Sequence, residues 1–181
     1  MGGERLTWRR HTDMAEGDFA PVWALYEKSF PLHERRLPAH QSQAMADRRY
    51  FCESVWEGET LLGLLFSWHL EGLCYVEHFA VSEALRCGGV GSDLLRDFCR
   101  REGQVVLEID PPVTDIARRR QGFYERLGFC PNPWPHAHPA YRKAFSPHEL
   151  VVMSWPSALE QGCYDRFYRA LAREVMEQNR P

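Results

Sequence analysis

Residues 76–95 read Val76-Glu77-His78-Phe79-Ala80-Val81-Ser82-Glu83-Ala84-Leu85-Arg86-Cys87-Gly88-Gly89-Val90-Gly91-Ser92-Asp93-Leu94-Leu95. An apolar strand passes through a short turn into a glycine-rich loop, and the loop opens a helix. Glycines let the backbone approach an anion and turn its N–H groups inward, and the helix N-terminus adds about half a positive charge. Arg86 adds a full charge beside them. The stretch therefore predicts a phosphate-binding site between a strand and a helix.

The spacing of this loop distinguishes between kinds of phosphate site. No Lys-Ser/Thr pair closes it as in a Walker loop, and it does not match Gly-x-Gly-x-x-Gly, so a nucleotide-binding protein is the weaker alternative. The loop resembles the Arg/Gln-x-x-Gly-x-Gly/Ala loop of the GNAT superfamily of acyl-CoA N-acyltransferases. Arg86, Gly89 and Gly91 stand at its three fixed positions.

A second segment supports the same resemblance. Residues 118–129 read Arg118-Arg119-Arg120-Gln121-Gly122-Phe123-Tyr124-Glu125-Arg126-Leu127-Gly128-Phe129 and are similar to the family's Phe/Leu-Tyr-Glu-Lys/Arg-Leu-Gly-Phe helix end. The apolar strand Val105-Val106-Leu107-Glu108-Ile109 lies between the two motifs, in the family's order. The resemblance covers roughly residues 5 to 155.

Composition limits the class of protein. The 181 residues fit one domain, 1–181, because typical domains hold about 100 to 200 residues. Apolar residues make up 44% of the chain and the net charge is −3, so no nucleic-acid partner is expected. No apolar run approaches the ~20 residues of a membrane span, and the N-terminus lacks the apolar core of a signal peptide. We therefore expect a cytoplasmic protein with no membrane partner.

Neither the cysteines nor the histidines predict a metal or disulfide site. Six cysteines contain no Cys-x-x-Cys pair and are expected to be free thiols. Cys87 stands out because a helix N-terminus beside Arg86 lowers a thiol pKa, but a small residue tolerated in the loop is the simpler interpretation. His136-Ala137-His138 has a metal-like spacing without an evident third ligand, so pocket-lining histidines are favoured and no metal is expected.

The order of the expected elements indicates a mixed α/β fold. Before the glycine loop we expect strands at 6–11, 50–56, 61–70 and 73–81 and helices at 18–30 and 40–48. Glu-Gly turns join the last three strands into an antiparallel meander. A helix from Gly91 to about Arg101 then crosses to a strand at 105–110. The prediction is a mixed, mostly antiparallel central sheet flanked by helices, which the resemblance identifies as the acyl-CoA N-acyltransferase fold.

The C-terminal third is expected to contain two helices separated by an ordered loop. The first helix runs from about Asp115 to Leu127, and the proline-rich segment 131–148 forms a loop with a short strand. A last strand at 149–154 precedes a helix at about 157–178, with Leu159, Cys163, Phe167, Leu171 and Val175 at four-residue steps. This stripe packs on its own sheet or, alternatively, helps a dimer form, so the chain is expected to be a monomer or homodimer.

The resemblance implies how acetyl-CoA, as co-substrate, would be bound. The loop would hold the CoA pyrophosphate, and the preceding strand would pair its backbone with the pantetheine arm. The implied contacts are Phe79, Ala80, Val81, Arg86, Cys87, Gly88, Gly89, Val90, Gly91 and Ser92. The chain departs from the family where Ala117 and Arg120 replace a frequent Asn and Ala. The arginines 118–120 then either meet the CoA phosphates or form a solvated basic face.

Amine acetylation needs a group that takes the ammonium proton. Because side chains alternate, Tyr75, Glu77 and Phe79 are expected on one face of their strand, and Val76, His78 and Ala80 on the other. Glu77 and His78 then cannot both face the substrate. Family members often carry a Glu or His base at or near position 77, acting through water, which favours Glu77. The alternative is an acid paired with an arginine, and His78 is interpreted as a core histidine.

The reaction also needs a donor that protonates the leaving thiolate. Tyr124 matches the family tyrosine that often has this role, and its phenol is protonated at neutral pH because its ordinary pKa is about 10. The alternative is an aromatic side chain packed between Phe123 and Phe129.

The resemblance also indicates where an acceptor binds. Glu34, Arg35, Tyr141 and Arg142 lie in the two loops that usually wall the acceptor site, with generic surface charge as the alternative. The implied activity is transfer of an acetyl group from acetyl-CoA to a primary amine of a small molecule or peptide, by direct attack in a ternary complex. A non-catalytic acyl-CoA-binding sensor is the main alternative, and transfer to a hydroxyl a more distant one.

Overall fold

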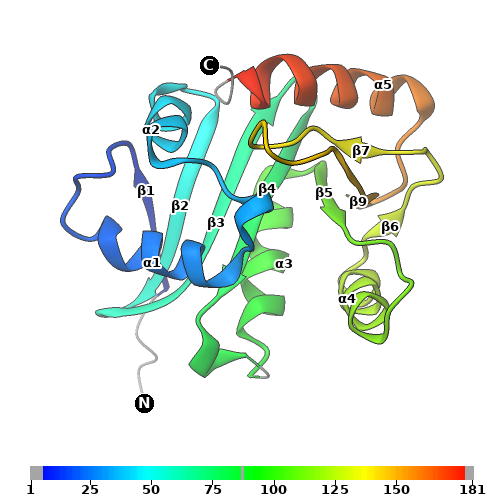
Figure 1. Cartoon of the computed structure of the whole chain (residues 1–181). Coiled ribbons are helices and arrows are strands. Elements are labelled where there is room, and N and C mark those ends of the chain that lie inside the picture. Colours follow the sequence, from blue (N-terminus) through cyan, green and yellow to red (C-terminus); the bar gives the residue numbers. More distant parts are fainter. Residues whose placement is uncertain (1–5, 87, 178–181) are drawn as a thin grey trace.

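The computed structural model describes residues 6–86 and 88–177, and in them a seven-stranded sheet has the order β1-β2-β3-β4-β5-β9-β6 (Figure 1). Neighbouring strands are antiparallel except β4 and β5, which are parallel. The predicted mixed, mostly antiparallel sheet is thus confirmed.

The bounds of the elements agree closely with the expected ones in the first two thirds of the chain. The strands are β1 (Leu6–His11), β2 (Tyr50–Glu57), β3 (Thr60–Leu70), β4 (Leu73–Val81), β5 (Val105–Ile109), β6 (Cys130–Pro131) and β9 (Val151–Trp155). Two further strands, β7 (Ala137–His138) and β8 (His148–Glu149), pair with each other. The α-helices are α1 (Phe19–Ser29), α2 (Pro38–Ala46), α3 (Val90–Glu102), α4 (Asp115–Arg126) and α5 (Gln161–Ala170). Short 3-10 helices lie at η1 (Leu32–Glu34) and η2 (Glu83–Leu85), and a π-helical turn, η3 (Leu171–Val175), continues α5.

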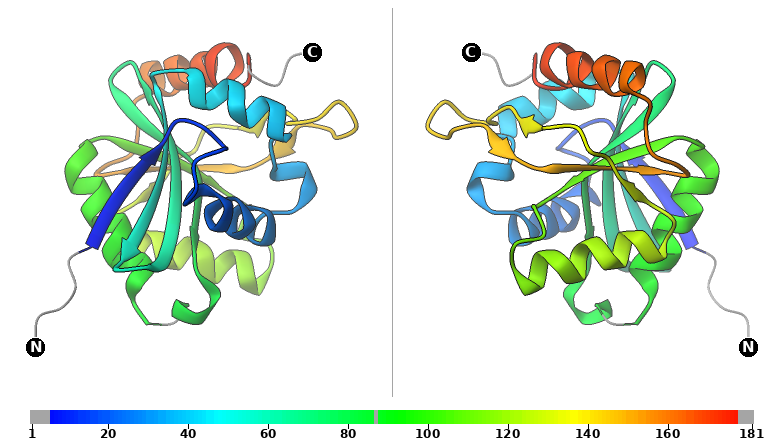
Figure 2. Two further views of the ribbon diagram at one scale, coloured as in Figure 1. Left: turned by 90° about the vertical axis from the view of Figure 1, so that its left-hand side faces the viewer. Right: turned by 90° about the vertical axis from the view of Figure 1, so that its right-hand side faces the viewer.

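Two layers of helices cover the sheet, as the edge-on views of Figure 2 show. The α1, α2 and α5 helices bury their apolar side chains on one face, around Tyr26, Trp68 and Phe167. The α3 and α4 helices cover the other face, around Leu95 and Phe98. Burial of these side chains on both faces is the main force that holds the sheet between its helices.

The meander depends on tight turns between long strands. In the β3–β4 hairpin Leu70 pairs with Leu73, so the connection is the two residues Glu71 and Gly72. Gly72 has a φ of +78°, a conformation that side chains disfavour, and a Cβ there would touch nothing. The backbone conformation of the turn therefore accounts for a glycine at this position, and close packing does not.

The C-terminal helix begins later than the sequence predicts. It starts at Gln161 instead of 157, because the preceding residues are held in extended form by other contacts. The Asn132 side chain accepts a hydrogen bond from the Leu159 N–H at 2.7 Å, and Ser154 Oγ donates to the Ser157 carbonyl at 2.7 Å. Most of the predicted stripe is buried against the sheet, and residues 178–181 lie outside the described residues.

Two expectations about the whole chain can be compared with the described residues. The cysteines among them, 52, 74, 99, 130 and 163, are free. None of the described helices has the length and apolar composition that a bilayer crossing needs.

Candidate active site

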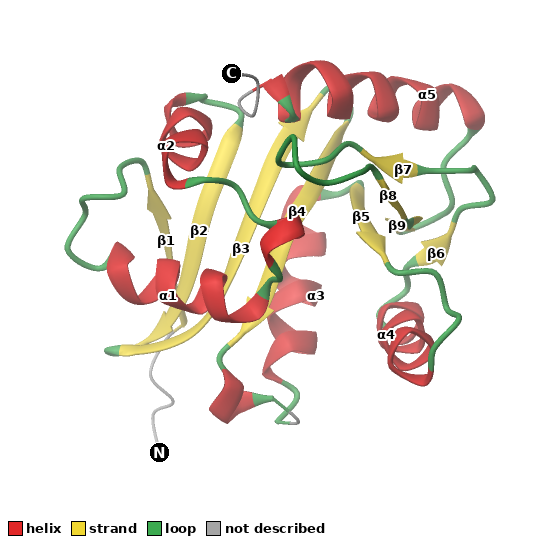
Figure 3. Cartoon of the chain, viewed as in Figure 1, coloured by secondary structure: helices red, strands yellow, loops and turns green. Residues whose placement is uncertain are grey.

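The β4 and β5 strands begin side by side and then separate (Figure 3). In the described chain Cys74 pairs with Val105 and Tyr75 with Val106, and no further pair follows although β4 continues to Val81. A cavity of about 630 Å³ lies where they part, and residues of both strands line it. This is the size range of small-molecule sites, about 300–1,000 Å³.

A β-bulge at Glu77 changes which backbone groups face the opening. The Cys74 N–H donates to the Gln104 carbonyl on the β5 side, whereas the Ser82 N–H donates to the Leu62 carbonyl on the β3 side. In a regular strand, the N–H groups of residues eight positions apart point to the same edge. Those of Cys74 and Ser82 point to opposite edges, so β4 must contain one extra residue between them. Pairing with β3 does skip Glu77. The N–H and C=O groups of Phe79 and Val81 therefore face the opening, and those of Ala80 face β3.

The bulge also overturns the predicted alternation of side chains. The expectation that Glu77 and His78 lie on opposite faces is wrong. His78 packs edge-on against Tyr26 and Phe30, on the face covered by α1, and Glu77 bonds to groups on that same face. Phe79, expected beside Glu77, packs in the cluster on the other face. The extra residue at the bulge shifts the side-chain pattern by one.

The carboxylate of Glu77 is enclosed and fully hydrogen-bonded. One oxygen accepts from Arg36 Nη2 at 2.7 Å and from the Tyr141 hydroxyl at 2.8 Å, and the other accepts from Trp68 Nε1 at 2.8 Å. The side chains of Glu77 and Arg36 are both 0% exposed. Burial alone would raise the pKa of Glu77, but the Arg36 charge and the other donors outweigh it and lower that pKa. This geometry favours the paired-acid interpretation over that of a proton acceptor.

His78 has the features of the predicted core histidine. Its Nε2 lies 2.8 Å from the Glu34 carbonyl, so this nitrogen carries the proton and donates it. Burial lowers the pKa of His78 to about 4. The ring is therefore neutral at physiological pH, and it fixes η1 to β4.

The glycine loop leaves backbone donors available at the start of α3. Gly89 directly precedes the helix with a φ of +82°. The amides of Gly89, Val90 and Gly91 donate to no other described residue, whereas those of Gly88 and Ser92 bond within the loop. A Cβ on Gly91 would lie 3.1 Å from Val81 Cγ2, so the helix approaches β4 closely. Arg86 lines the cavity, and Cys87 lies outside the described residues.

Tyr124 lines the same cavity from α4. Its ring lies 5.1 Å from that of Phe123 and 5.6 Å from that of Phe129, both edge-on. Burial raises the pKa of Tyr124 to about 12, and the hydroxyl has no hydrogen bond to another described residue. The side chain is thus both packed and a protonated acid at the cavity wall.

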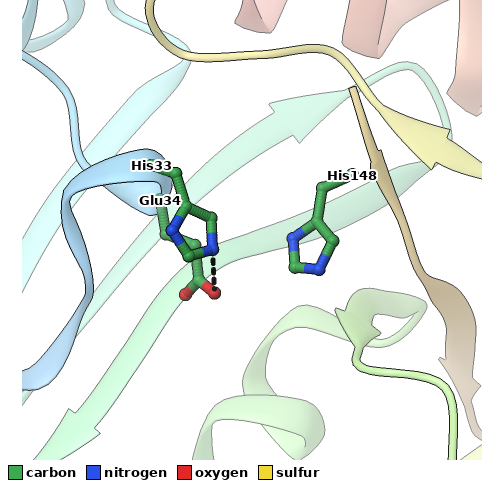
Figure 4. Close-up of side chains that lie close together, drawn as sticks. All are labelled: His33, Glu34 and His148. Carbon is green, nitrogen blue, oxygen red and sulfur yellow. Dashed lines mark ion pairs between the residues drawn. The ribbon is translucent and has the colours of Figure 1, made fainter. Parts of the chain in front are cut away.

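The residues predicted to bind the acceptor divide into two groups. Glu34 and Tyr141 line the cavity, but Arg35 and Arg142 are not among the residues that form its wall. Arg142 Nε donates to the Arg35 carbonyl at 3.3 Å, so this pair joins the two loops to each other. Figure 4 shows that His33 and Glu34, from η1, lie close to His148 from β8.

Several site residues were not predicted from the sequence. Glu108 is a buried carboxylate that lines the cavity, accepts from the Tyr75 hydroxyl at 2.5 Å and pairs with His136. Of the two histidines expected to line a pocket, His138 does line the cavity, with its Nε2 3.9 Å from Glu108, whereas His136 is not among the residues of the cavity wall. A single acid in the apolar strand Val105–Ile109 is a signal that could have identified Glu108. Arg36 gave no such signal, because it lies in a charged segment typical of a solvated loop.

A mixed sheet whose parallel pair separates around a cavity, beside a glycine loop that opens a helix, defines the acyl-CoA N-acyltransferase fold. The chain belongs to the acetyltransferase (GNAT) family, whose model matches residues 19–129. It is therefore an acyltransferase enzyme. A comparison with curated proteins found no match.

Solved structures agree with this assignment. A protein described as a GNAT-family acetyltransferase from Bacteroides thetaiotaomicron is 25% identical, with a TM-score of 0.87 over 94% of this chain and 98% of its own. A Bacillus subtilis acetyltransferase in complex with CoA is 13% identical, with a TM-score of 0.57 over 83% and 97%. The ribosomal-protein-S18-alanine N-acetyltransferase from Escherichia coli is 15% identical, with a TM-score of 0.56 over 86% and 96%. The last two show similarity of fold.

The Arg36–Glu77 ion pair leads to a prediction about stability. Replacing Arg36 with alanine leaves the Glu77 charge buried without its cation, which should lower the free energy of unfolding by about 3–5 kcal/mol at pH 7. Glu77 has a lowered pKa, so its stabilisation is present above its ordinary value of 4.5 and is lost as the pH falls through the folded-state value. Without Arg36, burial is left as the largest influence and raises the pKa of Glu77, so the deficit of Arg36→Ala should shrink as the pH falls from 7 through the ordinary value of 4.5.

Urea unfolding followed by circular dichroism measures this loss. Arg96→Ala is the control, because it breaks the exposed pair with Asp93 at 3.2 Å and should change stability far less. Equal effects of the two substitutions would show that the buried pair does not stabilise the fold.

Proposed function

We propose that this enzyme transfers an acetyl group from acetyl-CoA to a primary amine of a small molecule or peptide, by direct attack in a ternary complex. The observation that carries the proposal is that one cavity is lined by the open edge of β4, by Arg86 beside the glycine loop and by Tyr124. The relative of the same fold that was solved with CoA supports it.

The proposed contacts to acetyl-CoA follow from the available donors. The pyrophosphate would accept from the amides of Gly89, Val90 and Gly91, where the helix dipole adds positive potential. The pantetheine arm would pair with the backbone of Phe79 and Val81 in place of a sheet neighbour. In contrast, Arg118 is exposed and bonds to Asp115, which favours a solvated position, whereas Arg120 bonds to Asp110 and lines the cavity.

In the proposed chemistry, the thioester lies in the opening between β4 and β5. The acceptor's nitrogen attacks the thioester carbon, the C–N bond forms and the C–S bond breaks. The Tyr124 hydroxyl gives its proton to the leaving thiolate. Glu77 holds Arg36 and Tyr141 in place, because its oxygens are already bound by three donors.

Release of the CoA thiol in a library of amines tests the activity. An enzyme produces free thiol with at least one amine above the rate of hydrolysis, whereas a sensor module binds acetyl-CoA without turnover. Calorimetric binding alone does not separate these alternatives.

Replacing Gly89 with valine should weaken acetyl-CoA binding at least ~10-fold, about 1.4 kcal/mol, because a side chain would stand where phosphate oxygens are held. Isothermal titration calorimetry measures the change. Gly72→Val is a matched control, since both glycines have a φ near +80° and open space around the position of a Cβ. If both variants bind as the wild type does, the glycine loop is not the phosphate site.

Tyr124→Phe should lower kcat about 10- to 1,000-fold with little change in acetyl-CoA affinity, since the proton is needed only during chemistry. Steady-state thiol release and calorimetry provide the two measurements. A parallel loss of affinity and melting temperature would instead support a packing role. Full activity of the variant would mean that water protonates the sulfur.

A further inference from the structure

Besides Glu77, three carboxylates among the described residues line the cavity: Glu34, Glu108 and Asp110. Glu108 is bound by a tyrosine and a histidine, and Asp110 pairs with an arginine of α4 at 2.8 Å. The Glu34 carboxylate accepts no hydrogen bond from another described residue, and the nearest side-chain nitrogen paired with it is His33 Nε2 at 3.4 Å. Glu34 is therefore the cavity carboxylate best able to accept a proton from a ligand.

The backbone fixes Glu34 at the opening between the strands. Its N–H donates to the Pro31 carbonyl at 3.0 Å, and its carbonyl accepts from His78 Nε2 at 2.8 Å. His78 follows the bulge on β4, so η1 is attached to β4 where the strand loses its neighbour. The Glu34 side chain also interacts electrostatically with Asp110, one residue beyond β5. Glu34 thus lies beside the middle of β4, just past the bulge, and near the end of β5.

Charged groups from four parts of the chain face Glu34. They are His33 on η1 and His148 on β8, which Figure 4 shows beside Glu34, together with Arg120 on α4 and Asp110 after β5. Burial has the largest influence on the pKa of Glu34 and raises it, Asp110 raises it further, and the cationic groups lower it by less. A carboxylate with a raised pKa is a stronger base at neutral pH than an ordinary one.

We propose that Glu34 is the general base that takes the proton of the acceptor's ammonium group. This inference rests on the proposed function. One N–H bond of the ammonium breaks and the proton passes to a Glu34 oxygen. The freed lone pair then forms the C–N bond as the C–S bond breaks, and the second proton that the nitrogen loses restores the Tyr124 phenol after it has protonated the thiolate. The side chain is 34% exposed, so the neutral acid can return its proton to water after the product leaves. The substrate class is accordingly a positively charged primary amine.

The experiment compares pH profiles of kcat/KM for the wild type, Glu34→Gln, Glu34→Asp and Glu77→Gln, using an amine found by thiol release. Glu34→Gln should lower kcat/KM about 100-fold or more at pH 7 and abolish the acidic limb of the profile. Its acetyl-CoA affinity should stay within about twofold of the wild type. Glu34→Asp keeps a carboxylate base and should retain the acidic limb at a reduced rate. This variant distinguishes loss of the base from misfolding as the cause of a low activity in Glu34→Gln.

Glu27→Gln is the matched control, because this nearby carboxylate of α1 is 51% exposed and lies outside the cavity. It should behave as the wild type. Retention of the acidic limb in Glu34→Gln, or its loss in Glu77→Gln alone, overturns the proposal.

The ligand atoms of His33, Glu34 and His148 lie within 4.8 Å of one another. Activity abolished by EDTA and restored by zinc would also overturn the proposal, because Glu34 would then act on a metal ion.

The outcomes also separate this inference from the proposed function. A wild type that turns over amines while Glu34→Gln keeps its pH profile refutes only the role of Glu34. A wild type that releases no thiol with any amine in the library refutes the amine transfer and this inference with it.

Discussion

The extra residue at Glu77 in β4 is the constraint on which the site depends. In a regular strand, the backbone groups of Cys74 and Ser82 would point to the same edge of β4, the one that faces β5. Because of the bulge, the backbone groups of Phe79 and Val81 point toward the opening instead. Backbone groups at a sheet edge without a neighbouring strand can bind another extended chain, and here the Val81 carbonyl accepts, among the described residues, only from the exposed Arg86 Nε, at 3.4 Å. The same bulge turns Glu77 and His78 to one face, so both can anchor the loops beside the cavity.

Arg36 joins four segments that are distant in the sequence. It lies in the segment between η1 and α2, and its guanidinium donates to Glu77 on β4 and to the Val175 carbonyl at 2.9 Å in η3. Tyr141, from the proline-rich segment, bonds to the same Glu77 oxygen. A buried charge pair is weak evidence of net stabilisation over an apolar core, but removing one partner is strongly unfavourable. The pair therefore holds these loops in one arrangement more than it adds to overall stability.

The local signals in the sequence were enough to predict the strands of the first two thirds of the chain, the glycine loop and the helix that follows it, because each depends on nearby residues. The bulge could not be predicted, since one extra residue in β4 is specified by pairing with β3 and leaves the apolar pattern of 73–81 unchanged. The start of α5 was missed for a similar reason, as Asn132 holds Leu159 across 27 positions. Tyr124 and Glu34 were placed at the cavity by motif and by loop position, whereas Glu108 and Arg36 depend on tertiary contacts.

The proposed acid and base lie on opposite faces of the sheet. Tyr124 comes from α4 on one face, and Glu34 comes from η1, which is fixed to His78 on the other. A thioester that both side chains reach must lie in the opening between β4 and β5, because elsewhere the paired strands separate the two faces. Burial raises the pKa of both groups. For a carboxylate this strengthens the base that acts on the ammonium, whereas a phenol is protonated at neutral pH with or without the shift and becomes a weaker acid. Desolvation in the same cavity thus favours the proposed base, while the proposed acid depends on its position beside the leaving thiolate.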